Sequence, residues 1–163
     1  WEPETGYKVQ MWLTSDNTVL NIEATVPDQT YLGIMFGKSM KDSDVIIMQA
    51  NGSSSTYADY WASGYMAPTK DTVQNVSCTN TVSGTDVIYS CTRPLNTEET
   101  TQDKVLSLDA QFDISYAINT NTSNLQFHNR NGHEVVTLDS SSSEALWGVQ
   151  SSSATSIAAA AIT

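Results

Sequence analysis

Residues 31–49 read YLGIMFGKSMKDSDVIIMQ, two apolar runs joined by a polar stretch. The runs 31–36 and 45–48 are short, rich in β-branched or aromatic residues and bounded by turn-forming residues, which is typical of β-strands. A turn with Gly37, Lys38 and Ser39 leads to Met40. The stretch therefore predicts a β-hairpin that holds one methionine outside the sheet. There the thioether of Met40 could meet a metal or simply pack.

The rest of the chain repeats this pattern of short strands separated by turn signals. Residues 18–26, TVLNIEATV, alternate apolar and polar side chains with a period of two, as in a strand with one face exposed to solvent. No stretch has a convincing helical period. The sequence predicts an all-β, two-sheet antiparallel β-sandwich. The other expected strands are residues 7–13, 56–61, 72–78, 86–92, 105–108, 112–119, 125–128 (a short segment) and 134–138.

The chain of 163 residues divides into two predicted parts. Residues 1–139 are long enough for one domain with a real core. Residues 140–163 are rich in Ser and Ala, ending SSSATSIAAAAIT. This composition favours a linker or tail. An alternative is that the segment adds a strand to the sheet edge of a like subunit, which would build a homopolymer or filament.

The charge balance narrows the class of partner. The formal net charge is -11, whereas nucleic acids and anionic membranes need clustered Lys and Arg. We therefore expect no nucleic-acid partner, and no apolar run predicts membrane insertion. The chain opens on Trp1 rather than Met, which predicts a processed mature N-terminus.

Two cysteines and three sequons point to the same compartment. Cys78 and Cys91 flank a turn signal at residues 83–86, so they could face each other across a hairpin as a disulfide. Two buried free thiols are the alternative. Asn51, Asn75 and Asn121 each begin an N-glycosylation sequon in a predicted loop. These features predict an extracellular or cell-surface glycoprotein.

Catalytic motifs are missing from the sequence. There is no nucleophile elbow, no HExxH and no phosphate-binding glycine loop. Two histidines are too few for a copper site built from several imidazoles. The acidic residues Asp42, Asp44, Glu98, Glu99 and Asp103 could bind Ca²⁺ through carboxylate oxygens. They lack the regular spacing of a calcium loop, which favours solvated loop charge.

Several landmarks occur in an order that resembles the DOMON domain family, extracellular β-sandwiches found in dopamine β-monooxygenase-like proteins and related cytochromes. The resemblance spans roughly residues 9–138, and the order of the pieces makes it specific. The pieces are the hairpin at 34–48, DYWASGYMAPTKD at 59–71, CTRPLNT at 91–97 with Asp103 downstream, and FHNRNG at 127–132.

The resemblance implies a haem b site and an electron-transfer role without catalysis. Family members that bind haem b ligate the iron with one Met and one His, and Met40 and His128 match those positions. Asn131 lengthens the usual spacing between the His and the following Arg-Gly, which leaves His133 as the alternative ligand. Other family members bind no haem, so the competing interpretation is a haem-free structural or adhesive subunit.

Aromatic residues could flank such a haem, although they could equally be core residues. The expected partner is a redox protein or like subunits. The flanking candidates are Tyr31, Phe36, Trp61, Tyr65 and Phe127.

Overall fold

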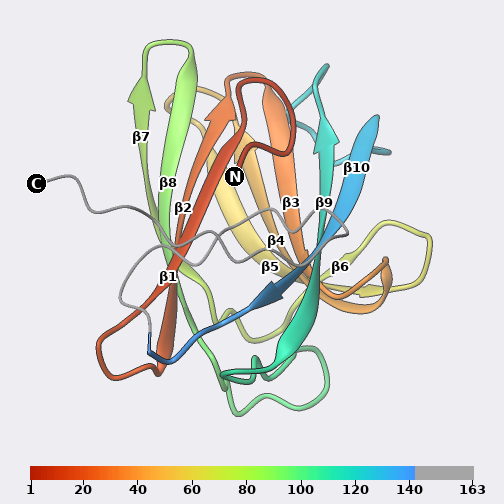
Figure 1. Ribbon diagram of the computed structural model, residues 1–163. Coiled ribbons are helices and arrows are strands. Elements are labelled where there is room, and N and C mark those ends of the chain that lie inside the picture. The colour runs from red at the N-terminus through yellow and green to blue at the C-terminus, as the bar shows by residue number, and fades with distance from the viewer. Residues whose placement is uncertain (142–163) are drawn as a thin grey trace, which may run out of the picture.

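The computed structural model describes residues 1–141, which form two antiparallel β-sheets packed face to face (Figure 1). One sheet has four strands in the order β1-β2-β8-β7, and the other has six in the order β10-β9-β3-β4-β5-β6. The predicted all-β sandwich is confirmed. The strands are β1 (Lys8–Leu13), β2 (Val19–Pro27), β3 (Thr30–Phe36), β4 (Lys41–Ala50), β5 (Thr56–Ser63), β6 (Thr69–Lys70), β7 (Ser77–Ser83), β8 (Asp86–Pro94), β9 (Gln111–Asn119) and β10 (Arg130–Thr137).

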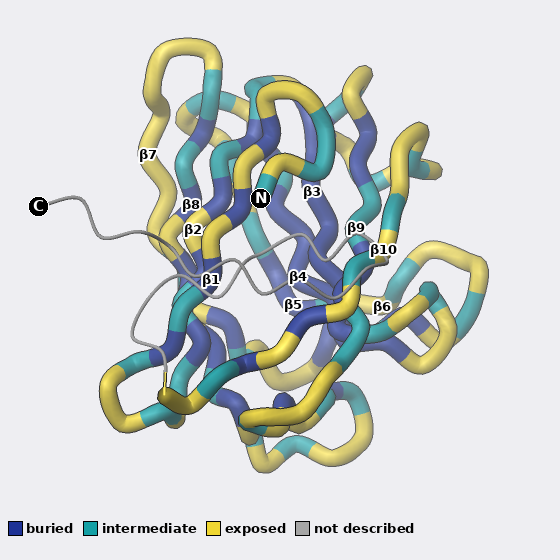
Figure 2. The backbone as a smooth tube through the Cα atoms, in the orientation of Figure 1, coloured by how far each residue is buried: buried dark blue, intermediate teal, exposed yellow. Residues whose placement is uncertain are grey.

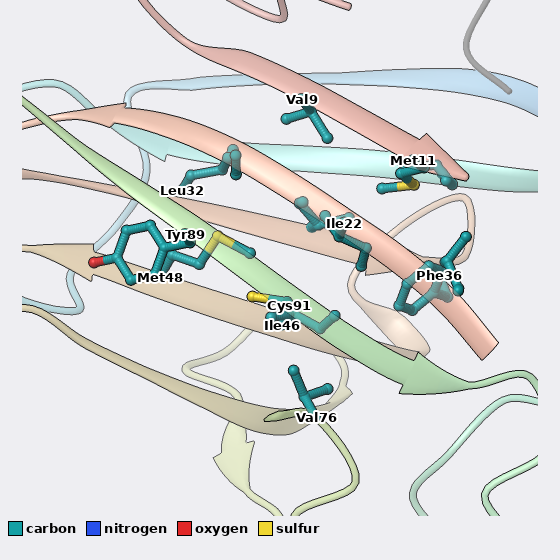
Figure 3. Close-up of a cluster of buried hydrophobic side chains, with 14 of the residues drawn as sticks. Val9, Met11, Ile22, Leu32, Phe36, Ile46, Met48, Val76, Tyr89 and Cys91 are labelled. Carbon is teal, nitrogen blue, oxygen red and sulfur yellow. The ribbon is translucent and has the colours of Figure 1, made fainter. Parts of the chain in front are cut away.

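The main hydrophobic core lies between the two sheets. Alternating residues of β2, such as Leu20 and Ile22, are fully buried, while their neighbours are less so. Figure 3 shows Ile22 and Tyr89 of one sheet on the same core as Leu32, Ile46 and Met48 of the other. The alternation follows from the strand period of two, which directs every second side chain to one face.

The predicted hairpin forms the centre of the six-stranded sheet as β3 and β4. All seven residues of β3 are buried (Figure 2). Leu32, Ile34 and Phe36 face the main core, whereas Met35 belongs to a second cluster with Val45, Ile47 and Ala62. The central strands therefore need cover on both faces. The four-stranded sheet covers one face only.

Three predicted strands differ from the structure. The strand expected at 72–78 begins at Ser77, because the side chain of Gln74 hydrogen-bonds the backbone N and O of Asp59, as a strand partner would. Residues 105–108 make only an isolated bridge, Leu108 to Leu138. Residues 125–128 also form no strand.

The disulfide prediction is confirmed. Cys78 of β7 and Cys91 of β8 are register partners and are covalently joined. β7 is an exposed edge strand, so the bond ties the sheet's least buried strand to its neighbour.

No helix in residues 1–141 is long and apolar enough to cross a membrane. The predicted tail lies outside the described residues from 142 onward, and polymerisation through it stays a prediction.

A buried ion pair connects the two sheets. Arg93 of β8 hydrogen-bonds Asp44 of β4, and both side chains are fully buried. The guanidinium also donates to the carbonyls of Pro94 (2.8 Å) and Lys104 (2.7 Å). It lies 5.0 Å from the ring centroid of Phe36. The two terminal nitrogens of Arg93 are thus engaged by a carboxylate and two carbonyls, while its Nε is buried without a partner among the described residues.

Two carboxyl groups near this pair have raised pKa values. Burial, and then the charges of Asp44 and Asp103, raise the pKa of Asp59 to about 8. Burial, followed by the charge of Asp103, raises the pKa of Asp71 to about 7. The folded protein therefore favours the protonated form of both groups.

The free energy of unfolding is expected to fall as the pH rises from about 5.5 to 8 in buffer free of divalent cations. The folded protein keeps a proton on Asp71 up to a pH of about 7 and on Asp59 up to about 8, whereas the unfolded chain has already released both. Each retained proton costs up to ~1.4 kcal/mol per pH unit. Urea denaturation across the range measures the slope. Asp59→Asn should flatten it, and a flat wild-type profile would contradict the prediction.

Candidate cofactor cavity

A cavity lies on the outer face of the six-stranded sheet, away from the main core. Its floor consists of the outward-facing residues of the central strands, including Gly33 and Met35 of β3 and Val45 and Ile47 of β4. At Gly33 a Cβ would meet Ala117 and Val45 at ordinary contact distances of 3.5–3.9 Å. No clash demands glycine there, so the missing side chain deepens the floor.

The loop between β9 and β10 folds back over this face as one wall of the cavity. The Tyr31 hydroxyl donates to the carbonyl of Gln126 (2.6 Å), and the Gln49 amide donates to the carbonyl of Ser123 (2.7 Å). These bonds fix the loop to β3 and β4 through its backbone. They position Phe127 and His128 in the cavity wall.

Met40 enters the cavity from the opposite end of β3. The turn after β3 is held by the Ser115 hydroxyl, which donates to the carbonyl of Gly37 (2.7 Å). The Ser43 hydroxyl donates to the carbonyl of Ser39 (2.5 Å). A Cβ at Gly37 would lie 2.1 Å from the Ser43 Oγ, so this close approach requires glycine. The turn thereby places Met40, half-buried, against the second cluster.

Both histidines line the same cavity, but their ring nitrogens differ in their hydrogen-bond partners. The Nε2 of His133 is hydrogen-bonded to the Asp113 carboxylate. The Nδ1 of His128 lies 3.3 Å from the Asn131 side-chain amide. The His128 ring stacks on Phe127 at 4.7 Å between ring centroids. Among the described residues, none hydrogen-bonds the Nε2 of His128, which is therefore available as a ligand atom.

The register explains how distant segments reach one cavity. β9 pairs with β3 so that Asn119 lies opposite Tyr31 and Ile114 lies opposite Phe36. The loop that carries His128 thus starts at the Tyr31 end of β3, and the turn with Met40 starts at the Phe36 end. Two candidate ligands approach one cavity floor from its two ends.

The sequence profile of the DOMON domain family matches residues 3–119. The chain belongs to the DOMON domain family. The match ends before residue 127, so the correspondence of His128 with the family histidine stays a prediction. No curated protein matches the chain.

Solved structures support the fold. The cytochrome domain of Myriococcum thermophilum cellobiose dehydrogenase aligns with a TM-score of 0.63 at 13% identity, covering 86% of this chain and 80% of that one. The cytochrome b domain of pyranose dehydrogenase from Coprinopsis cinerea aligns with a TM-score of 0.56 at 13% identity, covering 77% of this chain and 73% of that one. At such identities the likeness shows a shared fold only.

The predicted flanking residues of this DOMON domain divide into two groups. Tyr31, Tyr65 and Phe127 line the cavity. Phe36 does not, because its position in β3 turns the ring into the main core beneath Arg93. Trp61 also lies away from the lining residues, and its ring contacts the Lys104 ammonium at 5.4 Å. The structure thus does not bring Phe36 or Trp61 into the lining of the cavity.

The cavity fits a planar cofactor of the size of haem. Its volume is about 610 Å³, within the ~300–1,000 Å³ usual for ligand sites. Apolar side chains dominate its lining, and thioether and imidazole donors are both present. Three large apolar side chains at its margin are exposed, with exposed fractions of 84% for Tyr65, 66% for Met66 and 86% for Phe127. Such exposure is unusual unless a ligand or partner covers it.

The predicted calcium residues are only partly brought together. Asp44 and Asp103 lie in one buried cluster, where Asp59 joins them. Asp42 is exposed beside the β-bulge of β4, and Glu98 is exposed too. Sequence reasoning assigned no role to Asp59, although its place at an inward position of β5 was a usable signal.

The three sequons differ in the availability of the amide nitrogen, to which an N-linked glycan is attached. Asn51 and Asn121 are exposed, and each uses its amide oxygen as a hydrogen-bond acceptor. The Nδ2 of Asn75 instead donates to the buried Asp103 carboxylate at 2.7 Å. A glycan at Asn75 would replace one of the two hydrogens on this Nδ2, beside the buried Asp103 carboxylate.

Asn75 is therefore expected to remain unmodified when the protein is secreted from a glycosylating host, in contrast to Asn51 and Asn121. Glycopeptide mass spectrometry measures the occupancy of each site. Asn51→Gln and Asn121→Gln should each remove one glycan mass, and Asn75→Gln should remove none. High occupancy at Asn75 would contradict the prediction.

Proposed function

We propose that this DOMON domain binds haem b in the cavity and serves as an electron-transfer module. One observation carries the proposal: a single apolar cavity brings together Met40 from one end of β3 and His128 from the other. Haem, when bound, supplies one-electron redox chemistry. The similarity to cytochrome domains of two dehydrogenases supports the same role.

Met40 and His128 are the residues that would hold the haem iron. A ring ligated through Nε2 would carry its proton on Nδ1, which lies 3.3 Å from the Asn131 Nδ2. A 180° rotation of the Asn131 amide would turn its oxygen to this position, where it would accept a hydrogen bond from the Nδ1–H. The stacked Phe127 ring holds the imidazole plane in place. His133 is the weaker candidate, because Asp113 already engages its Nε2. Two protein ligands would leave no open position for oxygen or substrate, so we infer no enzymatic activity.

The remaining cavity residues would seat the macrocycle and exclude water. Met35, Val45, Ile47 and Ala62 provide an apolar floor. Lys38 at the margin can pair with a carboxylate of the cofactor. The exposed margin would leave an edge within reach of a redox protein partner.

An oxidising, extracellular location is consistent with this role. The disulfide between Cys78 and Cys91 is the supporting observation, because such bonds persist outside the reducing cytosol. Occupied sequons at Asn51 and Asn121 would support secretion independently.

The absorption spectrum with stoichiometric haem, oxidised and then reduced with dithionite, tests the proposal. A Soret band that shifts on reduction, with sharp α and β bands, is expected for six-coordinate iron. Met40→Ala should lower the midpoint potential by on the order of 0.1 V, because thioether ligation favours the ferrous state. Met66→Ala, which removes a thioether from the same lining, is the matched control.

A spectrum of free haem at all protein concentrations would overturn the proposal. The haem-free structural or adhesive subunit would then be the remaining interpretation. Equal effects of Met40→Ala and Met66→Ala on the potential would reject Met40 as the ligand while leaving haem binding in place.

A further inference from the structure

Three buried carboxylates meet at one end of the sandwich, apart from the cofactor cavity. One oxygen each from Asp44, Asp59 and Asp103 lie within 4.8 Å of one another. The side chains come from β4, from β5 and from the loop after β8. None of the three lines the cavity, and the adjacent Val45 faces the cavity from the other side of β4. The cluster is therefore a separate feature of the molecule.

The hydrogen bonds of these carboxylates follow one pattern. Asp44 Oδ2 accepts from Arg93 and from the backbone N of Lys104. Asn75 supplies the donors for the other two, through its backbone N to Asp59 Oδ2 and its Nδ2 to Asp103 Oδ2. In each case Oδ1 is buried and has no partner among the described residues. Each carboxylate is thus held by one oxygen, and the other is left unpaired.

When they are ionised, the carboxylates of this region are not balanced by protein cations. Asp71 is 6% exposed, and both of its oxygens are also without a described partner. Electrostatic interaction links Asp71 to Asp44 and Asp103. Arg93 is the one buried cation among the described residues, and it is committed to Asp44. Buried, unpaired carboxylate oxygens are costly, so a positive species that accepts them stabilises the fold.

We propose that Asp44, Asp59 and Asp103 form a binding site for one divalent, oxygen-preferring cation, Ca²⁺. All the available ligand atoms are hard carboxylate oxygens, with no imidazole or thiolate in the cluster, which excludes a zinc-type donor set. Ca²⁺ accepts irregular geometry, whereas Mg²⁺ demands near-ideal octahedral coordination. Asp103, which is 8% exposed, lies at the solvent side of the cluster and offers the route of entry.

The site performs a structural role. It would tie β4 and β5 to the loop after β8, adding to the contacts that Lys104 of this loop makes with Asp44 of β4 and Trp61 of β5. The proposal does not depend on haem, since no residue is shared with the cavity lining. A failed haem test would leave it unaffected.

The test compares the thermal unfolding of EDTA-treated protein before and after addition of CaCl₂. Saturating Ca²⁺ should raise the Tm of the wild type by roughly 5 °C, as binding to the native state alone requires. Isothermal titration should give one ion per chain. Asp59→Asn should abolish the response. The matched control is Asp42→Asn, which removes an exposed carboxylate from β4, the strand that also carries Asp44.

Three outcomes would overturn the proposal. One is an unchanged Tm together with no stoichiometric metal in elemental analysis. Another is an equal Tm rise in wild type and Asp59→Asn, which would mark general screening of the acidic surface. The third is an equal or larger Tm rise with Mg²⁺ than with Ca²⁺. If Asp59→Asn fails to fold, Asp103→Asn at the solvent side and the wild-type stoichiometry decide the question.

Discussion

His128→Ala is expected to lower the affinity for haem by about 100-fold or more, and His133→Ala should leave it nearly unchanged. The two side chains line one cavity, which makes them a matched pair. Asp113 holds the Nε2 of His133, whereas the Nε2 of His128 has no hydrogen-bond partner among the described residues. The difference should therefore come from ligation rather than from loss of an imidazole in the wall.

Titration of each variant with haem, followed at the Soret band, measures the affinity. Circular dichroism of the haem-free variants checks that the fold is retained, which we expect because both residues are on or beside the surface. The reverse order of affinities would assign the ligand to His133. Equal retention in both variants would mean that neither histidine is required individually, which would reject His128 as the specific ligand.

Arg93→Met is expected to destabilise the fold by about 3–5 kcal/mol, the usual cost of leaving a buried charge without its partner. The substitution keeps the volume of the side chain but removes all the donors to Asp44, Pro94 and Lys104. Asp44 would then remain fully buried with only the backbone N of Lys104 as a described donor. Such a loss is a large fraction of the stability of a domain this size.

Urea denaturation measures the change, with Arg130→Ala as the control. Arg130 pairs with Glu4 at 3.3 Å, but both side chains are largely accessible to water, and exposed pairs contribute ~0–1 kcal/mol. The double variant Asp44→Asn/Arg93→Met should recover part of the loss, since it removes the orphaned charge. If Arg93→Met lowers the free energy of unfolding no more than Arg130→Ala does, the buried pair does not contribute to stability.

Local pattern predicts the strands of this domain well and its covering loops poorly. The hairpin of β3 and β4 was predictable because apolar runs and turn residues act over a few neighbours. The strand expected at 72–78 was wrong because Gln74 replaces a backbone partner with a side chain. That contact depends on β5, which no local pattern of residues 72–78 contains.

The candidate site likewise combines residues that the sequence predicts with an arrangement that depends on distant contacts. Met40 was predictable from the turn, and His128 from family resemblance, yet neither reveals a shared cavity until the register of β9 against β3 is known. Phe36 and Trp61 were misplaced because a strand's period of two does not say which face meets the larger core. Asp59 was overlooked because a single aspartate in an aromatic strand carries no motif.

The pairing of β9 with β3 has a consequence for the order of assembly. β3 and β4 are joined by a short turn, so they can pair soon after they are synthesised. β9 reaches β3 only after β4 to β8 have been made, and the loop with His128 follows it. The two candidate ligands therefore come together last. Acquisition of the cofactor would therefore report that β9 has paired with β3.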